Sequence, residues 1–349
     1  MKQLWLRLST LFRRLLHGNN MAEKKEIAFK LWTEKVVGHG EDAPPLLVNE
    51  ENGCAVGVFD GMGGSGAALC ESDLGKDYTK AYVASRIVSS SVEAYLKEHI
   101  GTNDILVNDL KEVIAYRLRQ EQERFPPQSK SLLRSKLVRD YPTTMALVTL
   151  TKSEKSMDID SYWAGDSHCY LWEKDGFFQI SLDDLEEKND PMENLHNDSP
   201  ISNCICADRD FIINHRHLQL SKEPVIILCA TDGCFGYYQT PMHFEYILSD
   251  CLQRAKNEEE WKLLVKDELL KVTGDDCSLS LIAIGYKSFD ELKMSKKSHT
   301  VTGFPELIKQ EKTIAWAKEE LEKENNKYLQ NIAEGWKIYK QTYMKYLND

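Results

Sequence analysis

Residues 56–66 read "VGVFDGMGGSG", an apolar run that stops at Asp60 and continues into four glycines within six residues. A short apolar run bounded by turn residues is typical of a buried strand. The glycines predict a tight turn that leaves room for a substrate and for metal-bound water. We therefore expect Asp60 at the end of a strand, as a ligand of metal ions.

Three more acidic sites also adjoin a strand or a glycine-rich turn. They are Glu41-Asp42 in "GHGEDAPPLLV", Asp232-Gly233 in "EPVIILCATDG" and Asp275-Asp276 in "DDCSLSLIAIGY". Neighbouring strands bring their ends together, and carboxylates meeting there repel one another unless cations lie between them. Such oxygen ligands suit Mg²⁺ or Mn²⁺. Two ions about 4 Å apart can activate a bridging water for attack on phosphorus, and the Gly61 carbonyl could add a ligand.

Each of these signals has a simpler interpretation when it is taken alone. Asp-Gly is also typical of an ordinary turn, and a glycine-rich loop can instead bind the phosphates of a nucleotide. The nucleotide alternative predicts a Walker-type lysine or a GxGxxG spacing within a βαβ unit. The stretch "GMGGSGAALCESD" has no lysine at the required place, and its surroundings differ from such a unit.

The composition describes an acidic globular protein. The chain has 349 residues, of which 42% are hydrophobic and 28% charged, as in proteins with a sizeable core. Its formal net charge of −11 argues against nucleic acid as the main ligand, because the phosphate backbone would be repelled. Nine cysteines without a CxxC pair predict reduced core thiols and a cytoplasmic location rather than a zinc site.

Residues 1–22 form a basic segment that is distinct from the rest. Leucines recur at helical spacing, and no acidic residue precedes Glu23. The apolar stretch is interrupted by arginines and is too short to span a membrane. It predicts an amphipathic helix on an anionic membrane or a partner. The alternatives are a helix docked on its own domain, or an upstream extension with Met21 as the working start.

The middle of the chain, residues 24–287, reads as one strand-rich domain. Helical periodicity marks residues 78–100 and 107–125, and "DIDSYWAGDSHCYLWEKDGFFQIS" predicts three strands joined by turns. Residues 183–222 are polar and irregular, so we expect an inserted flap-like loop. Residues 288–349 predict one or two long amphipathic helices. These helices either pack back on the domain or serve as an oligomerisation arm.

An ordered set of motifs resembles the metal-dependent serine/threonine protein phosphatases of the 2C type, the PPM family. The motifs are "GEDAP", "VGVFDGMGG", "TTMALV", "YWAGDSHCYLW", "ILCATDGCFGY" and "DDCSLSLIAI", over roughly residues 30–287. The resemblance implies an α+β fold, a four-layer α-β-β-α sandwich of two antiparallel sheets flanked by helices. It also implies a site for two Mg²⁺ or Mn²⁺ ions at one end, with extra helices at both termini of this chain.

The resemblance also implies roles for individual residues. Asp60 would bridge both metals, the Gly61 carbonyl would bind one, and Asp232 and Asp275 would bind the other. Glu41 and Asp42 would act through metal-bound water, and Asp166 in "AGDS" would help to bind a third metal. Asp276 stands where the family usually has asparagine, so we prefer Asp275 as the direct ligand.

Three departures from the family pattern concern the substrate. Met62 stands where the family's turn normally carries a histidine that protonates the leaving alkoxide, a step often contributing about 10²–10⁴-fold. The stretch "EKVVGHGED" has no phosphate-binding arginine, and Lys35 and His39 are not at its position. His168 replaces a usual arginine.

We therefore expect a slow metal-dependent enzyme that hydrolyses phosphoserine and phosphothreonine in proteins by attack of a metal-bridging hydroxide. Its catalytic carboxylates would be Asp60, Asp232 and Asp275. Hydrolysis of aryl phosphates, whose leaving groups depart easily, should be slowed least by Met62. One alternative is a pseudophosphatase that binds a phosphoprotein as a regulatory module. A second alternative is a non-enzymatic membrane adaptor, which depends on the two termini alone.

Overall fold

A computed structural model describes residues 26–71, 77–102, 105–125, 138–154, 156–187, 190–197, 199–221, 223–297 and 304–345. The expected basic helix of residues 1–22 lies outside these ranges. The chain divides into two compact units, residues 1–299 and 300–349. None of the helices in the described ranges is long and apolar enough to cross a membrane.

Two antiparallel sheets form the centre of the first unit. One sheet has the order β1 (Ile27–Thr33), β12 (Cys277–Ile284), β11 (Val225–Ala230), β8 (His168–Trp172) and β9 (Phe177–Gln179). The other has the order β10 (Asn214–Ser221), β7 (Ser156–Ala164), β6 (Met145–Lys152), β3 (Gly53–Val58) and β2 (Leu46–Glu50). A small ribbon pairs β4 (Leu69–Glu71) with β5 (Asp77–Thr79).

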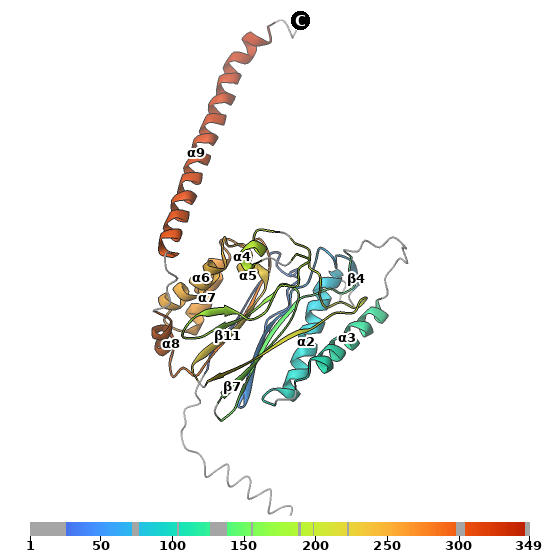
Figure 1. Cartoon of the computed structure of the whole chain (residues 1–349). Helices are drawn as coiled ribbons and strands as arrows, with labels where there is room; N and C mark the ends of the chain where they lie inside the picture. The colour runs from blue at the N-terminus through green and yellow to red at the C-terminus, as the bar shows by residue number, and fades with distance from the viewer. Residues whose placement is uncertain are drawn as a thin grey trace, which may run out of the picture. The chain divides into compact units, whose positions relative to one another are not determined.

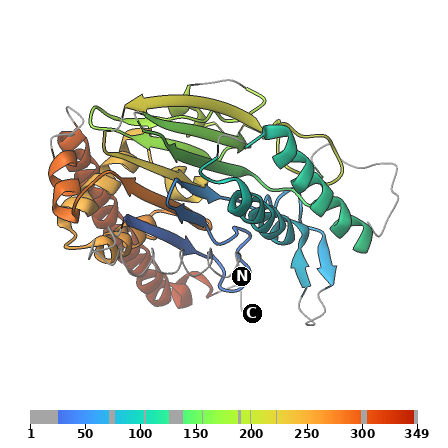
Figure 2. The same cartoon turned by 90° about the horizontal axis from the view of Figure 1, so that it is seen from below.

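Helices cover the outer faces of both sheets. Figures 1 and 2 show α2 (Lys80–His99) and α3 (Val107–Arg124) on one side. The opposite side carries α6 (Pro241–Arg254), α7 (Glu258–Leu269) and α8 (Phe289–Lys296). Two one-turn helices, α4 (Pro191–Asn194) and α5 (Asp232–Phe235), lie near the end drawn at the top. The expected four-layer sandwich is confirmed.

Three apolar cores hold these layers together. One core lies between the sheets and contains Val56 and Ile227, while the other two join each sheet to its helices. Because β3, β11 and β12 are covered on both faces, all of their residues are buried. This explains why they read as continuous apolar runs in the sequence. All nine cysteines are buried and free, as expected for reduced core thiols.

The flap-like segment ends earlier than its sequence predicts. We expected an irregular loop over residues 183–222, but Asn214–Ser221 form β10, which pairs with β7 along its whole length. The strand lies at the edge of its sheet, so half-buried residues such as Leu218 alternate with exposed ones such as His217. This alternation with period two was the overlooked signal, because the polar half of the strand masked the apolar half.

Candidate metal centre

Strand ends from both sheets meet at one end of the sandwich. β3 ends two residues before Asp60, and β11 ends two residues before Asp232. β12 starts directly after Asp276, and its antiparallel pairing places this start beside the end of β11. Glu41 and Asp42 lie in the loop between β1 and β2. Antiparallel pairing thus brings together residues that are far apart in the sequence.

The carboxyl groups at this end form a cluster, here named the carboxyl centre: Asp42, Asp60, Asp166, Asp232 and Asp275. Asp60 shares side-chain hydrogen bonds with Asp42 and with Asp232. Asp166 is close enough to repel Asp60, and it also interacts with Asp232. Asp275 in turn repels Asp232. Every aspartate that the sequence assigned to metal binding therefore lies in one cluster.

Burial and mutual repulsion disfavour the charged form of these groups. Burial raises the pKa of Asp42 to about 8. Burial, and then repulsion from Asp42 and Asp232, raises the pKa of Asp60 well above its ordinary value. The pKa values of Asp166 and Asp232 are also raised, again mainly by burial. Such shifts mark groups that lack a compensating positive charge.

The donor set of the carboxyl centre fits divalent cations. The buried Oδ1 of Asp166 has no hydrogen-bond partner. No three His, Cys, Asp or Glu side chains in the described ranges are already spaced as metal ligands. Asp60 instead hydrogen-bonds to Asp42 and to Asp232, and each such contact between two carboxyl groups requires a proton. A divalent cation would replace these protons and cancel the repulsion, and aspartate oxygens are its preferred ligands.

The glycine-rich turn after Asp60 is held by a threonine pair. The Asp60 carbonyl accepts hydrogen bonds from the Thr144 main-chain N–H at 2.8 Å and from Thr143 Oγ1 at 2.6 Å. A Cβ atom at Gly63 would lie 1.8 Å from Oε2 of Glu41. A side chain at residue 63 would therefore displace the Glu41 carboxyl. Glycine is required at residue 61, where a Cβ atom would lie 2.6 Å from the main-chain carbonyl oxygens of Ala81 and Glu41.

Asp276 clamps the loop that carries the acidic pair. Its Oδ1 accepts the N–H of Lys35 at 2.7 Å, and its Oδ2 accepts the N–H groups of Glu41 at 2.5 Å and Asp42 at 3.4 Å. Asp275 is exposed, and one of its oxygens accepts the N–H of Asp276 at 2.9 Å. The main chain thus uses both oxygens of Asp276, which favours Asp275 as the ligand.

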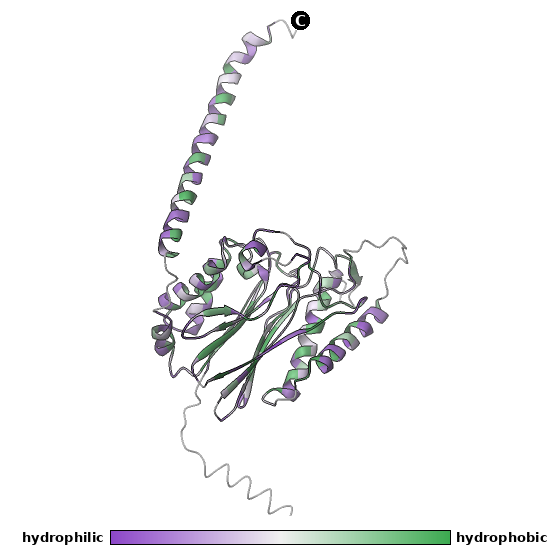
Figure 3. Cartoon of the chain, viewed as in Figure 1, coloured by the Kyte–Doolittle hydropathy of each residue, from purple (hydrophilic) through white to green (hydrophobic). Residues whose placement is uncertain are grey.

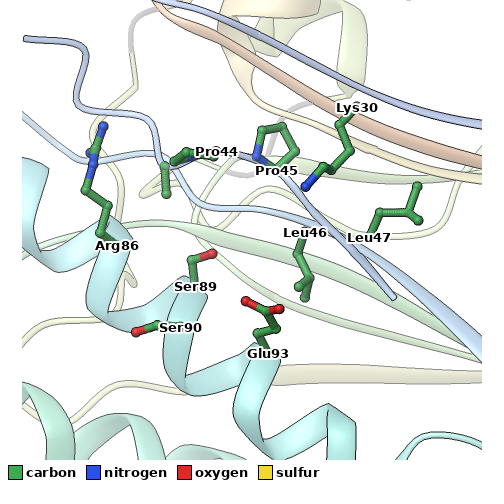
Figure 4. Close-up of a pocket in the computed structure, with 10 residues that line it drawn as sticks. Lys30, Pro44, Pro45, Leu46, Leu47, Arg86, Ser89, Ser90 and Glu93 are labelled. Carbon is green, nitrogen blue, oxygen red and sulfur yellow. The ribbon is translucent and has the colours of Figure 1, made fainter. Parts of the chain in front are cut away.

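Arg86 of α2 holds the same loop from the other side. Its Nη2 donates to the Gly40 carbonyl at 3.0 Å, and its Nη1 donates to the Glu41 carbonyl at 3.2 Å. The guanidinium also stacks over the Tyr82 ring at 3.3 Å. Arg86 lines a cavity of about 260 Å³ between α2 and the start of β2 (Figure 4). The guanidinium of Arg86, which contacts the loop of the acidic pair, is therefore engaged by main-chain carbonyls.

The flap, defined from here as residues 183–213, is tied to the turn that carries Asp166. The N–H of Asp184 donates to the Gly165 carbonyl at 3.0 Å, and the N–H of Gly165 donates to Oδ2 of Asp184 at 3.1 Å. A cavity of about 300 Å³ lies between the flap and the carboxyl centre, lined by His196, Asp166 and Asp232 among others. The flap thus forms one wall of the candidate site.

His168 also lines this cavity and is held on both sides of its ring. Its Nε2 pairs with Oδ1 of Asp183 at 2.6 Å, and its Nδ1 lies 2.7 Å from the Tyr170 hydroxyl. The imidazole stacks on Phe235 with the ring centroids 3.9 Å apart. Both ring nitrogens have partners, so His168, the first residue of β8, joins this strand to the flap.

Sequence reasoning overlooked the residues that support the site. Arg86 and Gly40 are separated by 46 residues, and Asp183 and His168 by 15 residues. No local pattern links such pairs, because the fold alone brings them together. Asp276 was noticed only as a second-choice ligand, although the adjacent acidic pair Asp275-Asp276 was itself a usable signal.

Comparison with known proteins places this geometry in a family. A family model described as Protein phosphatase 2C matches residues 39–272, more than half of the chain, and ends before Asp275. No curated protein matches the chain.

Solved structures of bacterial phosphatases share the fold. A bacterial serine phosphatase has 18% identity and a TM-score of 0.53, over 75% of this chain and 98% of that one. Stp1 from Staphylococcus aureus has 17% identity and a TM-score of 0.52, over 75% and 96%. The PPM phosphatase MsPP from Mycobacterium smegmatis has 11% identity and a TM-score of 0.51, over 74% and 98%.

Proposed function

The chain belongs to the protein phosphatase 2C family, and we propose that it is an active Mg²⁺- or Mn²⁺-dependent phosphatase of phosphoserine and phosphothreonine in proteins. The carboxyl centre is the main support for this proposal. A cluster of repelling carboxyls is costly in a protein that serves only as a scaffold. At neutral pH, each carboxyl whose pKa is raised on folding lowers the stability of the folded state. Its retention favours a site that binds cations and performs chemistry.

The proposal assigns each carboxylate a place around two cations. Asp60 would contact both, with the Gly61 carbonyl on one and with Asp232 and Asp275 on the other. Glu41 and Asp42 would orient water beside them, and Asp166 would help to hold a third cation. When bound, such cations lower the pKa of water and neutralise charge on the phosphoryl oxygens. The chain's own contribution is to keep these oxygens in place through Asp276 and Arg86.

The proposal includes a slow step at the leaving group. Met62 cannot donate a proton to a departing serine or threonine oxygen, and both nitrogens of His168 have partners. Lys35 and His39 of the acidic loop are exposed. Phosphoserine needs proton donation more than an aryl phosphate does, because its alkoxide is a poor leaving group. We therefore expect aryl phosphates to be the better substrates in vitro.

The proposed domain organisation follows the same assignment. Catalysis belongs to residues 24–287, with the flap as an insertion. The sequence grouped residues 288–349 as terminal helices, but α8 packs on this domain through the buried Leu292, and only α9 belongs to the second unit. Nine buried, free cysteines support a cytoplasmic enzyme, because reduced thiols are typical of that compartment.

The decisive experiment measures p-nitrophenyl phosphate hydrolysis with Mn²⁺, with EDTA, and in Asp232→Asn. Turnover should require Mn²⁺ and should fall by at least about 100-fold in the variant, because a ligand is lost. Asp267→Asn is the matched control, since this aspartate is exposed on α7. Its activity should equal that of the wild type.

The second candidate is a pseudophosphatase that binds phosphoproteins, and Met62 together with the engaged Arg86 favours it. Calorimetry with Mn²⁺ separates the two candidates. Mn²⁺ binding without turnover of aryl phosphates would establish the pseudophosphatase, whereas no binding at all would overturn the metal centre itself.

A further inference from the structure

An apolar line, interrupted by Asn325, runs along α9 (Phe304–Tyr343). Its members fall within about 80° of one another on the helix, given 100° per residue. They are Leu321, Tyr328, Ile332, Trp336, Tyr339 and Tyr343. These side chains are between 46% and 71% exposed. Figure 3 shows green, hydrophobic turns recurring along the otherwise purple helix.

The polar surface of α9 makes a membrane a poor partner for this line. The helix carries seven lysines, seven glutamates and no other charged residue, so its net charge is zero. A helix that lies on an anionic bilayer is usually rich in basic residues on its polar face. A mixed surface of Lys and Glu is instead typical of helices that pair with other helices.

We propose that α9 pairs with α9 of a second copy in an antiparallel arrangement, with a two-fold axis at Ile332. Leu321 and Tyr343 each lie eleven residues from Ile332, and Tyr328 and Trp336 each lie four residues from it. The two-fold axis therefore places Leu321 against Tyr343 of the copy and Tyr328 against Trp336. Ile332 meets its own equivalent, as an isologous interface requires.

The charges beside the apolar line favour the antiparallel orientation. Glu322 and Lys340 lie on one flank, and Glu324 lies on the other, each about 80° from Ile332. In the antiparallel pair, the flank that carries Glu322 and Lys340 faces the same flank of the copy. Glu322 then lies about 3 Å along the axis from the copy's Lys340. In a parallel pair, opposite flanks meet, and Glu322 would face Glu324 of the copy. Opposite charges thus adjoin only in the antiparallel pair.

The paired segment, residues 319–345, is about 40 Å long. This length corresponds to nearly four heptads on each strand, enough for a two-stranded coiled coil that dissociates at low concentration. Asn325 lies in the same line, facing Tyr339 of the copy, and a polar residue there fixes the register at a cost in stability. The pairing is independent of the proposed phosphatase activity.

Analytical ultracentrifugation of the full chain tests the pairing. The wild type should show a reversible monomer–dimer equilibrium. Ile332→Asp should raise the dimer Kd by at least about 100-fold, because the two-fold axis brings two carboxylates together in an apolar contact. Ile338→Asp is the matched control, since Ile338 is exposed on the same helix but lies off the line. Its Kd should stay within about threefold of the wild type.

Two further measurements test the orientation. Lys340→Glu should weaken the dimer by about tenfold, and adding Glu322→Lys should restore it, because the pair is exchanged. Mixed Leu321→Cys and Tyr343→Cys chains should form a disulfide-linked dimer under mild oxidation, while Leu321→Cys alone should not. The nine native cysteines are buried and should not compete.

Three outcomes would overturn the proposal. One is a wild type that stays monomeric when the protein concentration is raised 100-fold from a dilute sample. This result would show that the chain itself or another partner covers the line. Another is a dimer unaffected by Ile332→Asp. The third is a monomer that binds anionic phosphatidylserine vesicles through α9, which would assign the line to a membrane.

Discussion

Acidic residues at the carboxyl centre and acidic residues on α9 have different surroundings. In the carboxyl centre, burial raises the pKa values of Asp42 and Asp60, and repulsion from Asp232 raises both further. On α9, Glu319 and Glu320 are exposed and form ion pairs with Lys323 at 2.8 and 3.0 Å. Side-chain carboxyls therefore acquire strongly raised pKa values only where the fold gathers and buries them.

The first and largest prediction separates Asp275 of the carboxyl centre from its neighbour Asp276. Asp275→Asn should lower Mn²⁺-dependent p-nitrophenyl phosphate turnover by at least about 100-fold with little change in stability, because it removes a proposed ligand. Asp276→Ala should instead lower the free energy of unfolding by about 2–4 kcal/mol, because three main-chain N–H groups lose their acceptor. Steady-state kinetics and urea unfolding measure the two effects. Equal loss of activity without loss of stability in both variants would contradict this division.

The second prediction concerns the leaving group. Met62→His should raise turnover of a phosphoserine peptide by about 10–100-fold, because a proton donor then lies beside the departing oxygen. Turnover of p-nitrophenyl phosphate should change by less than about threefold, because its leaving group needs little protonation. Met242→His, on the exposed start of α6, is the control. An equal gain on both substrates would argue against a proton-transfer role.

The third prediction is a pH dependence of stability without metal. The pKa of Asp42 rises from 3.8 to about 8 on folding, so the folded state holds its proton more tightly than the unfolded state. This contribution is complete below about pH 4 and is lost as pH rises toward 8. In EDTA, the melting temperature should therefore fall between pH 5.5 and 8, by about 2–4 °C for each kcal/mol lost. Mn²⁺ should restore more stability at pH 8, and a flat profile in EDTA would contradict the buried cluster.

The smallest effect is expected on the exposed helix. Glu319→Gln with Glu320→Gln should change the free energy of unfolding by less than about 0.5 kcal/mol, because exposed ion pairs contribute little. Phosphatase activity should be unchanged. Steady-state kinetics and thermal unfolding measure the two effects. A large loss of activity would contradict the difference drawn between the carboxyl centre and α9.

The sequence alone determined the elements whose pattern is local. The apolar runs before Asp60 and Asp232 specify strands that are covered on both faces, and the turn residues between β7, β8 and β9 specify their connections. The period of α9 likewise specifies an amphipathic helix. The order of the acidic motifs was enough to identify the family and to name the carboxylates of the centre.

The tertiary structure decided which of these groups act on one another. Only the folded chain shows that Asp276 is engaged by the main chain while Asp275 is exposed. It also shows that Arg86 holds the acidic loop, and that β10 forms the edge strand of its sheet after the flap. These contacts join residues far apart in the chain, so no local period encodes them. Burial and dielectric environment also exist only in the fold, and they raise the pKa values of the aspartates that the fold gathers.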